Sequence, residues 1–178
     1  MILGLDISTS ITGYAILDLN GSVIDIGSWD LRNKNIFPDF YSKVTHCREK
    51  IKDISHCYEI EHIFIEPALN KFRPKKSSSH TISTLIKFNG ILSWLCLDEI
   101  GITPQFIPAV SARKKCGITI SRGQKAKEIV MKFLLDNEQD FIVEWTKHGN
   151  PKPEYYDRAD ALVMAKAGIE CLKEKSVL

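Results

Sequence analysis

The sequence contains no long apolar run and no recognisable targeting segment. Of its 178 residues, 44% are hydrophobic and 26% are charged, which is typical of a soluble globular protein. No stretch approaches the roughly 20 consecutive apolar residues of a membrane helix. The first residues include Asp6 and no basic segment, so we expect no secretory signal. We therefore expect a cytoplasmic protein, of a bacterium or a phage-infected host cell, with no membrane partner.

The cysteines are few, and their spacing does not suggest disulfide pairs. The five cysteines are an odd number, widely scattered, and no two of them form a CxxC pair. Reduced thiols in a cytosol-like compartment explain this pattern better than a disulfide framework does. They are Cys47, Cys57, Cys96, Cys116 and Cys171.

Acidic residues are nearly missing from the middle third of the chain. Residues 71–127 hold 11 lysines and arginines but only two acids, Asp98 and Glu99. The segments on either side are net acidic, so the overall charge of +2 hides this block. Such a block suits a polyanion, because lysines placed on phosphates release counterions. A merely solvated basic surface is the alternative that charge alone leaves open.

Hydrophobic periodicity predicts one mixed α/β domain over residues 1–178. Two-residue alternation and short apolar runs predict strands, and three-to-four-residue spacing predicts amphipathic helices. Trp94 and Met164 fall on apolar helical faces, so we expect them in the core. The expected strands are 2–7, 12–19, 22–29, 61–66 and 105–107, with a turn at Asn20-Gly21; the expected helices are 40–58, 81–100, 123–135 and 154–173.

Four acids occur where solvated surface acids are not expected. Asp6 lies in an apolar strand, and Glu66 ends another. Asp157 and Asp160 are three residues apart, on one face of the last helix. Clustered carboxylates repel one another unless a cation joins them, and hard oxygen ligands suit Mg²⁺ or Mn²⁺. Two such ions about 4 Å apart can activate a water molecule and stabilise the leaving oxygen of a phosphodiester.

Each acid also has an interpretation without catalysis. Asp6 is placed to cap the turn after its strand, and Glu66, before Pro67, is placed to face solvent. Asp157 suits the first turn of a helix because of the macrodipole, and Asp160 can pair with a lysine. The residues taken singly leave both interpretations open.

The ordered motifs resemble those of the RuvC-type Holliday-junction resolvases, members of the RNase H-like superfamily. The matching segments cover nearly the whole chain in order. They are Gly4-Leu5-Asp6-Ile7-Ser8-Thr9-Ser10 followed by Thr12-Gly13-Tyr14, then Ile63-Phe64-Ile65-Glu66, Asn89-Gly90-Ile91-Leu92, Phe106-Ile107-Pro108, Gly123 to Val130 with Lys127, and Tyr156-Asp157-Arg158-Ala159-Asp160-Ala161-Leu162.

The resemblance implies an α/β fold of the RNase H type. Its sheet is mixed and five-stranded, three antiparallel strands followed by two parallel ones, with flanking helices. Asp6, Glu66, Asp157 and Asp160 are then ligands of two Mg²⁺ ions per active site, with Mn²⁺ as a substitute. It further implies a homodimer that cuts two strands of a four-way DNA junction, leaving 5′-phosphate and 3′-hydroxyl ends.

Two basic groups are candidates for DNA contact. The first follows Glu66, so it should lie near the metal site; it includes Phe72, either a wedge in the junction centre or a buried residue. In the second, Lys127 matches the family best and is expected close to the scissile phosphate. The candidates are Lys71, Phe72, Arg73, Lys75 and Lys76, and then Arg113, Lys114, Lys115, Arg122, Lys125 and Lys127.

Two features depart from the resemblance. The family commonly has a lysine four residues after the proline of its fifth strand, where this chain has Ala112 followed by Arg113. The stretch 137–153 is longer than expected and leads directly into the helix with Asp157. His148 in that stretch either touches DNA or is a loop histidine without such a role.

Other functions remain to be weighed. A nuclease acting on flaps, forks or RNA is the nearest alternative, because one fold serves many polynucleotides. A non-catalytic junction-binding protein is disfavoured, because all four acids are present. Sugar kinases and actin-like ATPases open with a similar glycine-aspartate strand, but they need two domains to enclose a nucleotide.

Overall fold

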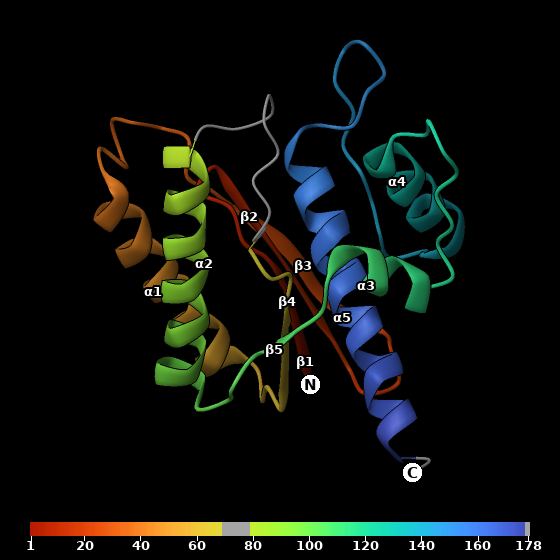
Figure 1. Cartoon of the computed structure of the whole chain (residues 1–178), viewed down its shortest axis with the longest axis horizontal. Coiled ribbons are helices and arrows are strands. Elements are labelled where there is room, and N and C mark those ends of the chain that lie inside the picture. The colour runs from red at the N-terminus through yellow and green to blue at the C-terminus, as the bar shows by residue number, and fades with distance from the viewer. Residues whose placement is uncertain (69–78, 177–178) are drawn as a thin grey trace.

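The computed structural model describes residues 1–68 and 79–176, which form a mixed five-stranded sheet (Figure 1). The strand order is β3-β2-β1-β4-β5. The first three strands pair antiparallel as a meander, and β4 and β5 then add in parallel with β1. This is the predicted arrangement. The strands are β1 (Ile2–Asp6), β2 (Ile11–Leu17), β3 (Val23–Asp30), β4 (His62–Ile65) and β5 (Gln105–Phe106).

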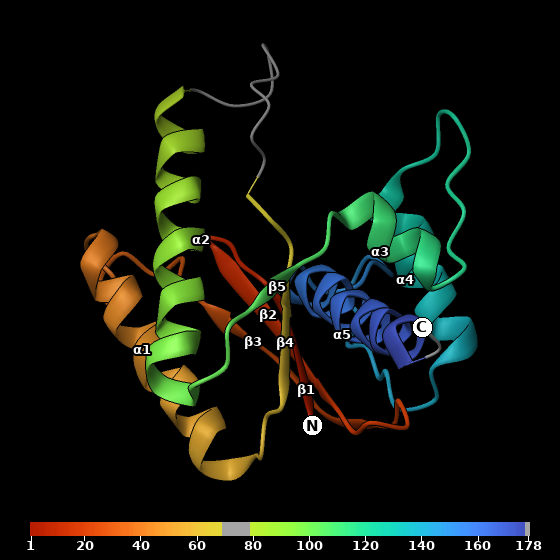
Figure 2. The same ribbon diagram turned by 60° about the horizontal axis from the view of Figure 1, so that its bottom comes forward.

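Helices cover both faces of the sheet (Figure 2). One face carries α1 (Phe40–Cys57) and α2 (Ser79–Ile100), which pack side by side. The other face carries α3 (Ala109–Lys115), α4 (Ala126–Asn137) and α5 (Glu154–Ser176), with α5 lying across β1 and β2. Within the described ranges, no helix combines the length and the apolarity needed to cross a membrane.

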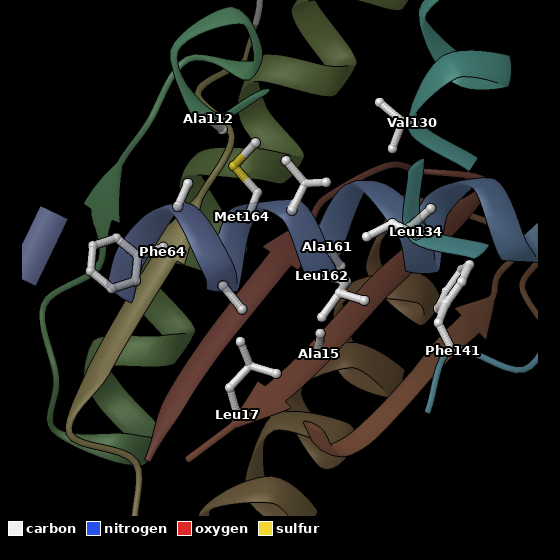
Figure 3. Packing of buried hydrophobic residues seen from close by; sticks show 14 of the residues in the cluster. Ala15, Leu17, Phe64, Ala112, Val130, Leu134, Phe141, Ala161, Leu162 and Met164 are labelled. Atoms are coloured by element: carbon white, nitrogen blue, oxygen red, sulfur yellow. The ribbon is translucent and has the colours of Figure 1, made fainter. Parts of the chain in front are cut away.

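Alternation along the strands divides the apolar side chains between two cores. In β1, Ile2 lies in the core under α5, whereas Leu3 and Leu5 lie in the core under α1 and α2. Figure 3 shows the α5 side, where Leu162 points toward Ala15 on β2 and Met164 points toward Ala112 on α3. Because both faces of β1 are covered, the strand is apolar at nearly every position, and Asp6 is the exception at its end.

Most elements begin and end within about three residues of the positions that periodicity predicts, and Met164 lies in the core as expected. Asn20-Gly21 forms the predicted turn, in which the Gly21 N–H donates to the Asp18 carbonyl at 3.2 Å. The seven-residue helix α3 was not predicted. It is too short to show a helical period, and Ala112 is its one fully buried residue.

The prediction for Trp94 is wrong. Trp94 lies on α2 and exposes 56% of its surface, although its neighbour Leu95 is buried. The helix is apolar on more than one side, since Ile86 and Leu97 are exposed as well. An apolar position on such a helix does not reveal whether another element covers it.

Candidate active site

The four acids line one cavity of about 330 Å³ at the carboxyl end of the central strands. Asp6 is the last residue of β1, and Glu66 directly follows β4. Because β1 and β4 are parallel neighbours, both acids reach the same edge of the sheet. Asp157 and Asp160 come from the first two turns of α5. The fold therefore brings together the four acids that the sequence places on three separate elements.

Two glycines allow α5 to approach the sheet closely enough for this. Gly13 pairs with Asp6 across the β1–β2 ladder. A Cβ atom on Gly13 would lie 2.1 Å from the Asp157 carbonyl oxygen, and one on Gly4 would lie 2.4 Å from the Ala161 carbonyl oxygen. Both distances are far below van der Waals contact, so only glycine fits. Close backbone packing thus sets the position of Asp157 beside Asp6.

Two buried polar side chains, Thr12 and Asn89, hydrogen-bond to the backbone next to Asp6 and Glu66. The sequence alone assigned no function to either residue. The buried Thr12 hydroxyl donates to the Ser8 carbonyl oxygen at 2.9 Å, which fixes the turn after Asp6. The buried Asn89 amide donates to the Glu66 carbonyl oxygen at 3.0 Å. A buried polar side chain close to an acid is the signal that would find such residues, and burial is not visible in the sequence.

Burial raises the pKa of all four acids, and repulsion from neighbouring acids raises that of Asp6, Glu66 and Asp157 further. For Asp6 the pKa is well above its ordinary value, first because of burial and then because of the charges of Asp160, Glu66 and Asp157. Burial is also the largest cause for Glu66, Asp157 and Asp160, and the charge of Asp160 raises the pKa of the first two further. The cavity therefore holds more negative charge than the neighbouring cations neutralise.

Two cations partly offset that charge. A guanidinium nitrogen of Arg113, on α3, lies 3.8 Å from a carboxylate oxygen of Asp160. The Lys127 ammonium, in the first turn of α4, lies 3.9 Å from a carboxylate oxygen of Asp157 and 5.8 Å from the centre of the Tyr156 ring. Both cations line the cavity and lower the pKa of Asp160. Arg113 therefore places a cation beside Asp160, although Ala112 occupies the position where the resemblance led us to expect a lysine.

The donor set of the cavity fits a hard divalent cation in its chemistry. The ligands available are carboxylate oxygens, which Mg²⁺ and Mn²⁺ prefer. A bound cation would offset both the burial of these charges and their mutual repulsion, the two causes that raise the pKa of Asp6 and Glu66. As the side chains stand, no three acids, histidines or cysteines in residues 1–68 and 79–176 are grouped closely enough to hold a metal ion. Coordination would therefore require side-chain rotation toward a common point.

The other predicted DNA contacts are spread more widely. Arg122 and Lys125 are exposed just before α4, and Lys125 forms an ion pair of 2.8 Å with Glu128. Lys114 is exposed on α3. Lys115 instead pairs with Glu174 at 2.6 Å, about four helical turns from Asp160, or roughly 20 Å along α5. Lys71, Phe72, Arg73, Lys75 and Lys76 lie outside the described residues.

The sheet order, the crossing of α5 and the flanking helices define the RNase H-like fold. Solved structures that share this fold include proteins that act on Holliday junctions. RuvC of Thermus thermophilus matches with a TM-score of 0.65 and 14% identity, over 98% of this chain and 96% of that one. RuvC of T. thermophilus in complex with a Holliday junction substrate matches with a TM-score of 0.63 and 12% identity, over 97% and 94%.

The yeast mitochondrial Holliday junction resolvase also matches, with a TM-score of 0.64 and 14% identity, over 99% of this chain and 80% of that one. No family model and no curated protein sequence matches the chain. At these identities the likeness establishes the fold, and the predicted RuvC-type architecture is confirmed.

Proposed function

We propose that the protein is a metal-dependent DNA endonuclease that resolves four-way junctions by paired phosphodiester hydrolysis. The observation that carries the proposal is the convergence of Asp6, Glu66, Asp157 and Asp160 on one cavity, with Arg113 and Lys127 at its wall. A hydrophobic binding site or a scaffold surface has no use for four crowded carboxylates. Their cost in repulsion is offset when divalent cations bind.

The four acids would hold two Mg²⁺ ions, or Mn²⁺ in their place. When bound, the ions supply the positive charge that activates the attacking water and stabilises the leaving oxygen. The water oxygen bonds to phosphorus, the bond from phosphorus to the 3′ oxygen breaks, and that oxygen takes up a proton. The products carry 5′-phosphate and 3′-hydroxyl ends, and no covalent enzyme intermediate forms.

Lys127 and Arg113 take different parts in this reaction. Lys127 is exposed at the cavity, so its ammonium can reach a non-bridging oxygen of the scissile phosphate and stabilise the charge that develops there. Arg113 is less exposed and lies against Asp160. It favours the ionised form of Asp160 and limits the directions in which that carboxylate can turn.

Branched DNA is the substrate that charge and fold favour together. The basic block of residues 71–127 supplies cations on both sides of α2 in the sequence, and phosphate contacts of this kind give affinity without reading sequence. One structure that shares the fold holds a Holliday junction substrate. Among polynucleotides, a four-way junction is therefore the first substrate to test.

We propose that a second copy of the chain binds to the exposed face of α2. Ile86, Trp94 and Leu97 expose 43%, 56% and 42% of their surfaces. With the exposed Gly90 they share one face of the helix, at spacings of three and four residues. Apolar side chains gathered in this way mark interaction surfaces. A homodimer through α2 would provide the two active sites that paired cutting requires.

Cleavage of labelled synthetic DNAs by the purified protein tests the proposal. The panel holds a four-way junction, a flap, a fork, a linear duplex and an RNA–DNA hybrid, each with Mg²⁺, Mn²⁺ or EDTA. We expect symmetric paired nicks confined to the junction and dependent on metal. Preferential cutting of flaps, forks or RNA would mean that the protein is a nuclease of the same fold with a different substrate. Absence of cutting on every substrate would contradict the nuclease.

A further inference from the structure

A short hairpin projects from the connection between α4 and α5. Phe141 and Val143 in this connection are buried, and the chain then leaves the core at Glu144 and returns at Lys152. The Lys152 N–H donates to the Glu144 carbonyl at 3.0 Å, and Trp145 and Pro151 form an antiparallel bridge. Residues 145–151, named the 145–151 hairpin below, stand beyond the N-terminal end of α5 (Figure 1).

The turn of the hairpin is hydrogen-bonded. The Thr146 N–H donates to the Asn150 carbonyl at 2.8 Å, and the Gly149 N–H donates to the Thr146 carbonyl at 3.0 Å. Gly149 has a φ of +75°, which glycine adopts without strain. The backbone of the hairpin is therefore shaped before any partner binds, which reduces the entropy lost on binding.

An exposed indole stands on this preformed hairpin. Trp145 exposes 52% of its surface, although an indole offers a large apolar area that is normally buried. Lys147 and His148 are also exposed, and residues 145–151 contain no acid. The nearest acid, Glu144, is paired with Lys152. An exposed aromatic ring beside a lysine is the combination that binds nucleic-acid strands by stacking and phosphate contact.

The hairpin is tied to the helix that carries Asp157. The Glu144 carboxylate at its base accepts a hydrogen bond of 3.2 Å from the Tyr155 hydroxyl. Tyr155 is buried in the first turn of α5, two residues before Asp157. These contacts fix the base of the hairpin relative to the helix turn that carries Asp157.

We propose that the 145–151 hairpin holds an unpaired nucleobase of the substrate, with Trp145 stacked on the base and Lys147 on an adjacent phosphate. The inference rests on the proposed function, because it takes DNA as the substrate of the adjoining cavity. A base inside a duplex has both faces covered by its neighbours, whereas a branch point exposes base faces. The hairpin would thus select branched over linear DNA.

Binding measurements in EDTA test the inference, since cleavage is then suppressed. The probes are a labelled four-way junction, a single-stranded oligonucleotide and a linear duplex. We expect Trp145→Ala to bind the first two roughly ten-fold more weakly and the duplex with unchanged affinity. Trp145→Phe keeps most of the affinity, because an aromatic face remains. Ile142→Ala is the matched control, since Ile142 exposes 81% of its surface outside the hairpin.

The outcomes separate this inference from the proposed function. If Trp145→Ala binds every probe as tightly as the wild type does, while the wild type cuts junctions with metal, then the role proposed for the hairpin is wrong. The proposed nuclease function is not affected by that result. If Trp145→Ala loses junction and duplex binding equally, base stacking is excluded. A wild-type protein that binds no DNA would overturn both. Thermal melts of each variant show that the differences do not arise from unfolding.

Discussion

The substitution Gly13→Ala tests whether close packing of α5 on the sheet creates the active site. A Cβ on Gly13 would lie 2.1 Å from the Asp157 carbonyl oxygen and 2.4 Å from its carbonyl carbon. Ordinary contact begins near 3.4 Å, so the two backbones would have to separate by about 1.3 Å. Neither atom belongs to a side chain that can rotate away, and the strain must be taken up by moving α5.

Overpacking of this kind costs about 3 kcal/mol, which lowers the Tm of a chain of this size by roughly 6–12 °C. A displacement of about 1 Å at a catalytic group costs on the order of 100-fold in rate. We therefore expect Gly13→Ala to remain folded at 25 °C and to cut junctions about 100-fold more slowly. Single-turnover cleavage at saturating enzyme, beside a thermal melt, measures both effects.

Gly27→Ala provides the comparison in the same sheet. Its Cβ would lie 2.5 Å from the Tyr14 ring, which belongs to a side chain that can move. We expect a smaller fall in Tm and a nearly normal cleavage rate. Gly13→Ala with the Tm and rate of the wild type would refute the reasoning, because α5 would then not depend on that contact.

Three further predictions follow from the site and from α2. Lys127→Ala should slow single-turnover junction cleavage by about 100-fold with little change in junction binding, and an equal loss of both would assign Lys127 to binding alone. Burial and then repulsion raise the pKa of Asp6 in the folded protein, so the stability of the metal-free protein falls as the pH rises from 3.8 through that pKa. Asp6→Asn should therefore raise the Tm in EDTA at pH 7.5, and calorimetry showing a lower Tm would contradict a destabilising charge at Asp6. Trp94→Glu should yield monomers in light scattering and unpaired single nicks, and an unchanged mass would exclude α2 as the dimer interface.

Periodicity was sufficient to predict the strand that ends at Asp6, the strand directly before Glu66, and the helix that carries Asp157 and Asp160. Their convergence was expected only from the resemblance to resolvases, because each acid had a local interpretation as well. Gly13 and Gly4 explain physically why the elements meet. A glycine in a strand shows only that something approaches it, and the sequence does not say what.

The positions of the cations were harder to predict. Arg113, Lys114 and Lys115 are consecutive, and on a helix consecutive side chains point about 100° apart. Since α3 was not predicted, the three could not be separated in advance. The structure places Arg113 beside Asp160 and Lys115 beside Glu174. The exposure of Trp94 was missed for a related reason, since no periodic pattern shows which apolar face another element covers.

The most direct test of the central claim is a comparison of Asp6→Asn with Asp136→Asn on a labelled four-way junction in Mg²⁺. Asp6 lines the cavity, whereas Asp136 is exposed on α4, so the same chemical change is made inside and outside the proposed site. We predict that Asp6→Asn binds the junction and does not cut it, while Asp136→Asn cuts as the wild type does. Normal cutting by Asp6→Asn would contradict the assignment of these acids as the active site.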